Sequence, residues 1–385
     1  MTLFRRTAFP SPPVATAEDP LPGLRGDPVT FDVRQVPGGP WKNIIIRAPN
    51  WVGDAVMVLP ALKAIRSHFS GARITLLARP HMTSIFSGEP YFDDFIPYEA
   101  KSLRQMWRQG RELAKWSFDL ALVFPHSISA ALVATFARIP TRVGYAERWI
   151  EPPGLLTHPL RAPKTAGLRQ IPMVDYYLHL AYALGCPKSS RRIWFEIPKE
   201  KEEEANRLFD GWGIKPGERV IGVSPGTAFG SSKLWPPEYF ARVADELARE
   251  HKARVVILCG PNEEDVADRL EGAMKSPAIN TSRDIVGMDV LKAVCKRLML
   301  LVSTDSGGRH FAVGAGVPVV VVMGSTYHVY TETEYEKYEI VHHRLDCWPC
   351  HKQVCPLGHH RCMKDLQPEK VLEACRRMLA RFPPE

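Results

Sequence analysis

The run Val220-Ile-Gly-Val-Ser-Pro-Gly-Thr-Ala-Phe-Gly-Ser-Ser-Lys-Leu-Trp-Pro-Pro237 decides the fold of this chain. It opens with a short apolar stretch, which predicts a buried β-strand. It closes with Trp235 and a pair of prolines, where a helix can begin. A buried strand, a glycine-containing loop and a helix in this order form the repeating unit of a parallel α/β sheet.

The same alternation occurs before and after this run. Before it, the sequence predicts strands at residues 43–47, 73–78 and 119–124 and helices at 54–69, 127–137 and 199–212. After it, the sequence predicts strands at 254–258, 298–303 and 317–323 and helices at 237–251, 263–274, 288–297 and 368–381. We therefore expect an α/β protein with parallel sheets in both halves of the chain.

The length of the chain indicates two domains, because 385 residues exceed what one hydrophobic core usually serves. We expect a proline- and glycine-rich extension at 1–40, a Rossmann-like domain at 41–195, a second Rossmann-like domain at 196–345, and a cysteine-rich segment with a closing helix at 346–385. Two facing domains of this kind leave a cleft at the carboxyl ends of their strands, where α/β proteins bind ligands.

The composition, 45% hydrophobic and 24% charged, is that of a globular protein. No apolar run has the length of a membrane span, and the first ten residues are not followed by the apolar stretch of a signal peptide. We therefore expect a cytoplasmic location. The net charge of +8 favours an anionic partner, which could be a nucleotide, a nucleic acid or an acidic membrane surface.

The loop inside the opening run has the composition of a phosphate-binding site. Its glycines let backbone N–H groups approach an oxyanion, the hydroxyls of Thr227 and the following serines add donors, and Lys233 supplies a positive charge. The alternative is an ordinary connection between a strand and a helix. These residues alone leave both interpretations open.

A second candidate follows the first predicted strand, in the turn Trp51-Val-Gly-Asp54. Asp is a preferred N-cap residue, so Asp54 has a purely structural interpretation. Its position also faces the expected cleft, where a carboxylate can act as a general base toward a hydroxyl. We expect the helix N-terminus to keep this carboxylate ionised.

A third candidate is the turn after the strand predicted at 298–303. Asp305 can accept ribose hydroxyls, and Ser306, Gly307 and Gly308 bring backbone N–H groups to a helix N-terminus, which suits a diphosphate. His310 lies one helical turn further on. A single histidine at such a place is often structural, but the adjacent glycines and acid favour a ligand site.

Four cysteines near the C-terminus have a spacing that suits a metal ion. Cys347, Cys350, Cys355 and Cys362 lie within sixteen residues and begin with a Cys-x-x-Cys pair. Such a set can close tetrahedrally on zinc or iron as a structural site. A reduced thiol cluster and a disulfide pair are the alternatives.

A basic segment at residues 101–115 is a further candidate for binding. Its five cations recur at spacings of three and four, which on a helix form one stripe, while Leu103, Met106, Trp107 and Leu113 fall elsewhere on the helix. A stripe of this kind suits the surface of an anionic membrane. A solvated helix face is the alternative.

Taken together, the first three motifs resemble the lipopolysaccharide heptosyltransferases of glycosyltransferase family 9. The resemblance covers residues 43–381. The turn at 51–54 and the run at 224–236 look most like the heptosyltransferase II branch, while the Asp-Ser-Gly-x-x-His run at 305–310 is shared more widely. The cysteine segment also looks like one found in many members of that branch.

The resemblance implies a GT-B fold and inverting transfer of heptose from ADP-L-glycero-D-manno-heptose to a lipopolysaccharide inner-core acceptor, with no cofactor required for catalysis. By this resemblance Asp54 matches the proposed base, Thr227 and Lys233 the ligands of the donor phosphates, and Asp305, Gly307 and His310 the donor loop. The acid that contacts the nucleoside is left open among Asn262, Glu263 and Glu264. A glycolipid acceptor would bring the enzyme to the inner face of the cytoplasmic membrane.

Three other functions remain open at this stage. A similar cleft could serve an enzyme that uses another nucleotide sugar, or a protein that binds an ADP-sugar without turnover. The basic charge and the cysteines could also indicate a nucleic-acid-binding protein. We expect no nucleic-acid partner, because the cations lie on α/β scaffolding and no RNA-binding sheet motif is present.

Overall fold

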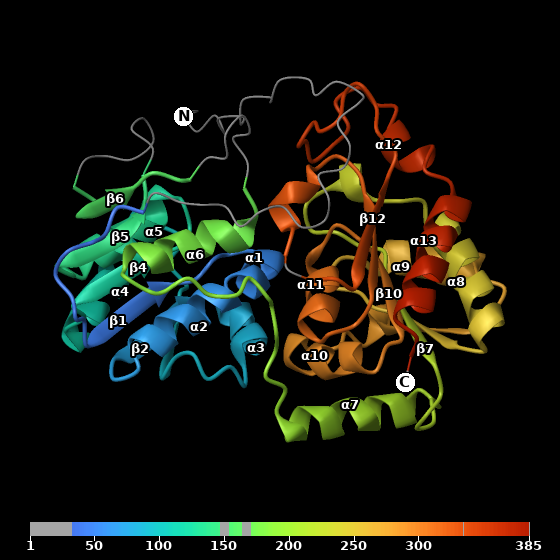
Figure 1. The fold of residues 1–385 in the computed structure, drawn as a ribbon, viewed down its shortest axis with the longest axis horizontal. Helices are drawn as coiled ribbons and strands as arrows, with labels where there is room; N and C mark the ends of the chain where they lie inside the picture. Colours follow the sequence, from blue (N-terminus) through green and yellow to red (C-terminus); the bar gives the residue numbers. More distant parts are fainter. Residues whose placement is uncertain (1–32, 147–153, 164–170, 334, 385) are drawn as a thin grey trace.

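The computed structural model describes residues 33–146, 154–163, 171–333 and 335–384. In these residues the chain forms two sheets, each with helices around it, side by side (Figure 1). The first sheet contains β1 (Asn43–Arg47), β2 (Arg73–Ala78), β3 (Asp94–Pro97), β4 (Leu120–Val123), β5 (Thr141–Tyr145) and β6 (His158–Leu160). The second contains β7 (Val220–Ser224), β8 (Arg254–Ile257), β9 (Ala278–Asn280), β10 (Leu300–Thr304), β11 (Val319–Met323) and β12 (Tyr338–His342).

The two sheets have the same topology. The strand order is β3-β2-β1-β4-β5-β6 in one and β9-β8-β7-β10-β11-β12 in the other, and the paired strands are parallel. This is the order of a Rossmann-like domain, in which the direction of winding reverses beside the first strand. The reversal points therefore lie between β1 and β4 and between β7 and β10, and ligands of such folds bind there.

The helices cover the faces of the sheets (Figure 1). In chain order they are α1 (Val52–Met57), α2 (Leu59–His68), α3 (Thr83–Phe86), α4 (Leu103–Leu113), α5 (Ile128–Phe136), α6 (Met173–Ala183), α7 (Lys199–Gly211), α8 (Pro237–His251), α9 (Glu264–Ala273), α10 (Met288–Lys296), α11 (Gly307–Gly314), α12 (Arg361–Lys364) and α13 (Pro368–Arg381). None of the helices within the described residues is long and apolar enough to cross a membrane.

The predicted strands and most predicted helices are confirmed, with small shifts at their ends. Strands β10 and β11 are buried along their whole length, which explains the continuous apolar run of β11; β10 is apolar up to Val302 and ends in Ser303 and Thr304. The sequence missed helix α6, the short helices α3 and α12, and five strands: β3, β5, β6, β9 and β12. Four of these strands are sheet edges with partly exposed side chains, so they lack an unbroken apolar signal.

The single helix expected at residues 54–69 is wrong. The structure has two helices here, α1 and α2, separated at Val58. Pro60 occupies the first turn of α2, where its missing N–H is not needed. In a continuous helix the same proline would remove a hydrogen bond and collide with the preceding turn.

The described end of the N-terminal extension packs on the first domain. The backbone N–H of Val36 donates to the carbonyl of Ala183 at the end of α6 (2.9 Å), and Val36 and Trp41 are buried in the core. Residues 1–32, which make up most of the extension predicted at 1–40, lie outside the described residues.

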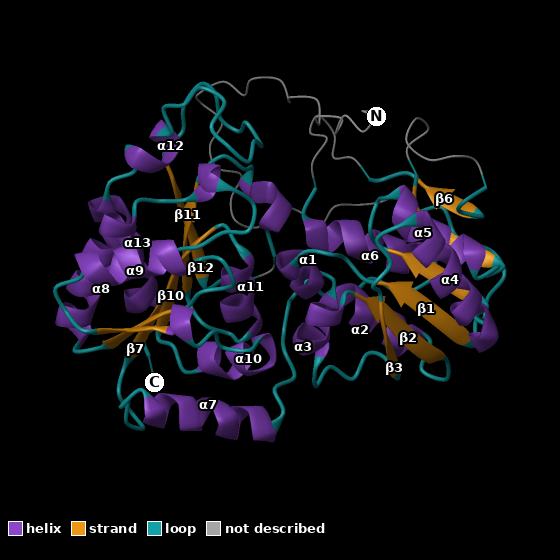
Figure 2. Cartoon of the chain, turned by 180° about the vertical axis from the view of Figure 1, so that it is seen from behind, coloured by secondary structure: helices purple, strands orange, loops and turns teal. Residues whose placement is uncertain are grey.

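The two domains are joined at a buried ion pair. Lys292 of α10 donates to the carboxylate of Glu89 (2.8 Å) and to the carbonyl of Ser87, and both charged side chains are fully buried. The adjacent elements α3 and α10 lie side by side (Figure 2). Burial raises the pKa of Glu89 to about 7, and the nearby ammonium opposes this rise.

Candidate active site

The candidate site lies where the reversal points of the two domains meet. Helix α1 follows β1, helix α11 follows β10, and the two helices are in contact across the domain boundary (Figure 1). A Cβ atom added to Gly53 would lie 3.1 Å from the ring of His310, and one added to Gly307 would lie 2.9 Å from Val52. The absence of side chains at these two glycines lets the turns after β1 and β10 approach closely.

Asp54 is the acidic residue of the first domain at this meeting point. The N-cap of α1 is Trp51, so the interpretation of Asp54 as an N-cap is wrong, and the carboxylate is available for another role. The hydroxyl of Tyr177 in α6 donates to its Oδ1 atom (3.0 Å). This contact joins two elements that are far apart in the sequence.

Burial raises the pKa of Asp54 to about 6, while the hydrogen bond from Tyr177 and the charge of Lys233 oppose the rise. Loss of hydration on burial thus outweighs the groups that favour the ionised form. A carboxylate with this pKa is still largely ionised at neutral pH and can accept a proton.

Lys233 and Asp305 form the polar centre of the second domain. The Lys233 ammonium donates to Oδ2 of Asp305 (2.6 Å) and to its backbone carbonyl (3.0 Å). Thr326 donates to the same carboxylate (2.7 Å), and Arg309 lies 3.4 Å from Oδ1. Burial alone would raise the pKa of Asp305, but the two cations outweigh burial and hold it well below its usual range.

The contact of Asp305 with ribose hydroxyls stays a prediction; in the structure its Oδ2 atom accepts hydrogen bonds from Lys233 and Thr326. These contacts fix the position of the ammonium. A lysine has three N–H donors, and two of them point to Asp305. The same ammonium lies 4.7 Å from the centroid of the Phe229 ring.

Thr227 and Glu263 lie at the neighbouring strand ends. The Thr227 hydroxyl accepts the backbone N–H of Phe229 (3.2 Å), which shapes the loop after β7. The Glu263 carboxylate packs against Gly226, where a side chain would collide with it, and accepts the N–H of Gly260 (2.8 Å). Of the three candidates for contact with the nucleoside, Glu263 thus lies beside the loop after β7. Asn262 and Glu264 are exposed.

The loop at 305–310 forms the N-terminus of α11, as the sequence predicts. Ser306 is its N-cap residue, and Gly307 and Gly308 open its first turn. The first N–H groups of a helix have no intrahelical partner, so they can receive an anion. Burial, with a smaller effect from Arg309, holds the pKa of His310 well below its usual range, so this imidazole is neutral.

Sequence reasoning assigned no role in the site to three residues of this arrangement. Tyr177, Thr326 and Arg309 reach Asp54 or Asp305 from other elements or from within a helix turn. A tyrosine 123 residues away from an acid carries no local motif. In this chain the predicted site residues follow buried strands. Thr326 also follows a buried strand, β11, so this pattern could have identified it.

Helix α4 places the predicted basic stripe on the surface of the first domain. Its cations are exposed, as expected. The apolar residues, however, divide into two groups: Met106 and Leu113 pack inward, while Leu103 and Trp107 are 63% and 54% exposed. The two exposed apolar residues are one turn apart and therefore share the outer face with cations.

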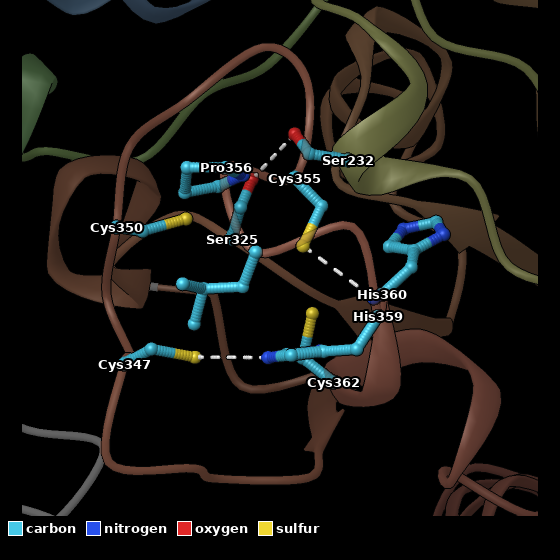
Figure 3. A pocket seen from close by; sticks show the side chains of 10 residues that line it. Ser232, Ser325, Cys347, Cys350, Cys355, Pro356, His359, His360 and Cys362 are labelled. Atoms are coloured by element: carbon cyan, nitrogen blue, oxygen red, sulfur yellow. Dashed lines mark hydrogen bonds between the residues drawn. The ribbon is translucent and has the colours of Figure 1, made fainter.

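The four cysteines predicted as metal ligands surround one pocket (Figure 3). Ser232, Ser325, His359 and His360 also border it. All four cysteines are free thiols. Burial raises the pKa of Cys362 to about 11, and the nearby Cys350, Cys347 and Cys355 add to the rise, which shows that the four sulfur atoms are within electrostatic range.

Comparison with known proteins agrees with this architecture. The Campylobacter jejuni lipooligosaccharide heptosyltransferase 2 is 26% identical over 339 residues, which cover 87% of this chain and 98% of that protein. The solved structure of Escherichia coli ADP-heptose lipopolysaccharide heptosyltransferase II has a TM-score of 0.74 at 23% identity, covering 88% of this chain and 99% of that one. A family 9 glycosyltransferase from Veillonella parvula has a TM-score of 0.75 at 21% identity and covers 88% and 97%.

The fold is therefore that of a GT-B enzyme, with two facing Rossmann-like domains, as predicted. The model of glycosyltransferase family 9 (heptosyltransferase) matches residues 106–361. The chain belongs to this family and is a glycosyltransferase, which confirms the resemblance drawn from the motifs.

Proposed function

We propose that this enzyme transfers heptose from ADP-L-glycero-D-manno-heptose to a lipopolysaccharide inner-core acceptor, with inversion at the anomeric carbon. The names of similar proteins support both substrates. The observation that carries the proposal is that α1, which contains Asp54, contacts α11, the helix that follows Asp305, so closely that a Cβ atom added to Gly53 would lie 3.1 Å from the ring of His310. A base and a donor loop are thus brought together from opposite sides of the domain boundary, as a two-substrate transfer requires.

In the proposed reaction an acceptor hydroxyl attacks the anomeric carbon of the donor. Asp54 accepts the hydroxyl proton as the new carbon–oxygen bond forms. The bond between the anomeric carbon and the diphosphate oxygen breaks on the opposite face, and ADP leaves with the bonding electrons. Attack from one side and departure from the other invert the configuration.

The leaving diphosphate gains negative charge, and the second domain is built to receive it. The candidates for receiving this charge are the Lys233 ammonium, the loop at Thr227 and the helix N-terminus at Ser306, Gly307 and Gly308. The proposal assigns the stabilisation to these groups, so it requires no added cofactor. The neutral His310 is available to hydrogen-bond the donor, and Glu263 is the candidate for the nucleoside.

The central experiment is incubation of the purified chain with ADP-heptose and truncated lipopolysaccharide acceptors, with the product mass as the readout. The expected result is an increment of one heptose. Asp54→Asn should lower the rate about 10²- to 10⁴-fold, the usual contribution of a general base. Asp284→Asn, at an exposed site, is the matched control. A near-normal rate for folded Asp54→Asn would overturn the assignment of the base.

The donor site is tested separately by ADP binding. Lys233→Ala should weaken ADP affinity about 10- to 100-fold, because a charge-assisted hydrogen bond is lost. The exposed Lys275→Ala serves as control. Unchanged affinity would remove Lys233 from the site. A screen of other nucleotide sugars completes the test, since faster turnover with one of them would replace the proposed donor, and binding without turnover would contradict catalysis.

We further propose that α4 binds the membrane that carries the acceptor, at its cytoplasmic face. Leu103 and Trp107 present apolar surface, while Arg104, Arg108 and Arg111 beside them are exposed cations that suit anionic lipid headgroups. Sedimentation with vesicles of an anionic lipid should retain the chain at low salt. Trp107→Ala should release it, and Trp194→Ala, at another exposed tryptophan, should not.

A further inference from the structure

Residues 346–360 contain no helix or strand, although they pass close to the second domain (Figure 1). Two of their apolar side chains, Val354 and Leu357, are 67% and 62% exposed and belong to no core. A segment of this kind needs another source of stability. In short segments without a core this source is usually a disulfide or a bound metal ion.

The cysteines that flank and interrupt this segment are free and point into one pocket (Figure 3). The Sγ of Cys347 is 4.0 Å from Nε2 of His359. The backbone N–H of His360 donates to Sγ of Cys355 (3.4 Å), the type of bond that orients a thiolate ligand.

We propose that Cys347, Cys350, Cys355 and Cys362 bind one structural zinc or iron ion, and that the ion fastens residues 347–362, the cysteine clasp, onto the loop after β7. Four thiolates favour these two metals and leave no open position for catalysis. As the described side chains lie, no three Cys, His, Asp or Glu residues already form a coordination set. Binding therefore draws the exposed loop at 352–358 inward.

The clasp contacts the loop after β7 directly, at the residue before Lys233. The backbone N–H of Ser232 donates to the carbonyl of Gln353 (3.0 Å), and its hydroxyl donates to the carbonyl of Lys352. At Gly230 a side chain would collide with the Gln353 carbonyl, so the two backbones pass in close contact.

A second group of contacts fastens the clasp to the end of β11. The N–H of His351 donates to the carbonyl of Ser325 (2.9 Å), and the indole N–H of Trp348 donates to the carbonyl of Gly324 (3.0 Å). The Ser325 hydroxyl in turn contacts that of Ser232 (2.9 Å). The clasp thus bridges two loops of the second domain, and loss of the metal should loosen both.

This arrangement gives the metal a role in donor binding, a conclusion that rests on the proposed function. Ser232 fixes the turn from which Lys233 extends to Asp305. Among the described residues, the Nε2 atom of His351 is buried and has no hydrogen-bond partner, so it can serve a bound ligand.

The first test is elemental analysis of the full chain, purified under reducing conditions without a metal-affinity step. The expected content is about one zinc or iron ion per chain. The double variant Cys350→Ser/Cys362→Ser should lose the metal, and Cys186→Ala, a buried cysteine of the first domain, should retain it. A metal-free wild-type chain, or a disulfide found between clasp cysteines by peptide mapping, would overturn the proposal.

The second test measures the fastening itself by amide hydrogen exchange. Removal of the metal by a chelator should accelerate exchange in the peptide containing Ser232 by about tenfold or more, and adding zinc or iron back should restore protection. Unchanged exchange after complete metal loss would refute the clasp. This readout needs no substrate. It uses the wild-type chain, so its outcome does not depend on whether a cysteine variant folds.

ADP affinity links the clasp to the donor site. The metal-free chain should bind ADP about tenfold more weakly, the effect of losing the hydrogen bonds that order a binding loop. If the chain with its metal binds no ADP, the proposed function fails while the metal content and the exchange result still stand. If ADP binding is normal with and without the metal, the role of the clasp in donor binding is wrong.

Discussion

Replacing Tyr177 by phenylalanine should move the pH dependence of catalysis. The change removes the hydroxyl that donates to Oδ1 of Asp54 and leaves the ring, which packs edge-on against Phe124 at 5.4 Å between centroids. The hydrogen bond favours the ionised carboxylate and therefore lowers its pKa. Without it, Asp54 should hold its proton more tightly, and the enzyme should need a higher pH to work.

The expected size follows from the kind of bond. A hydrogen bond to a charged group contributes about 1.5–3 kcal/mol, and about 1.4 kcal/mol corresponds to one pH unit. The wild-type rate should fall as the pH decreases through about 6, where Asp54 becomes protonated. In Tyr177→Phe this fall should occur about one to two pH units higher. The rate at high pH should be close to that of the wild type.

The assay is kcat as a function of pH at saturating donor and acceptor, with the thermal midpoint as a check of folding. Tyr182→Phe, on the same helix, is the matched control, because its hydroxyl contacts the backbone of Ser189 and not the site. An unchanged profile, or one displaced to lower pH, would refute the reasoning. An equal loss of rate at all pH values would show that Tyr177 acts in another way.

Three predictions concern stability. Lys292→Met leaves the buried Glu89 without its partner and should destabilise the fold by about 3–5 kcal/mol in urea unfolding. The double variant with Glu89→Gln should recover part of this loss of stability. No recovery in the double variant would contradict the pairing. Trp235→Ala removes a fully buried indole that donates to a backbone carbonyl (2.9 Å), and it should lower the free energy of unfolding by about 3–5 kcal/mol. An unchanged thermal midpoint would contradict this prediction. The pKa of Asp305 is lowered in the folded state, so its ionised carboxylate stabilises the fold at neutral pH, and this stabilisation is lost as the pH falls below about 4. Asp305→Asn should remove this part of the acid dependence of unfolding. An identical pH profile of unfolding for the variant and the wild type would disprove the prediction.

The strands that form the centre of each sheet could be predicted because both of their faces are buried. Residues 319–323 are a run of valines ending in methionine, and such a run has few other interpretations in a chain with this alternation. The edge strand β9 contains three partly exposed residues, and its pairing with β8 depends on the sheet already being formed. Local sequence carries little of that information.

The candidate site also has a part that the sequence predicts and a part that it does not. Asp54, Lys233 and Asp305 follow predicted strands, so their place in the cleft could be expected from topology. The hydrogen bonds that these residues form could not be predicted from topology. Tyr177 reaches Asp54 through the packing of α6, and the pKa of about 6 at Asp54 results from burial, which no motif encodes. The roles of these residues in catalysis stay predictions until the variants are measured.

The buried contact between Glu89 and Lys292 also sets how the domains can move. Separating two charges inside an apolar joint costs several kcal/mol, so this point should stay closed while the rest of the boundary opens. It should then act as a pivot near α7, and the contact between α1 and α11, farther from α7 in Figure 1, should be the part of the boundary that opens.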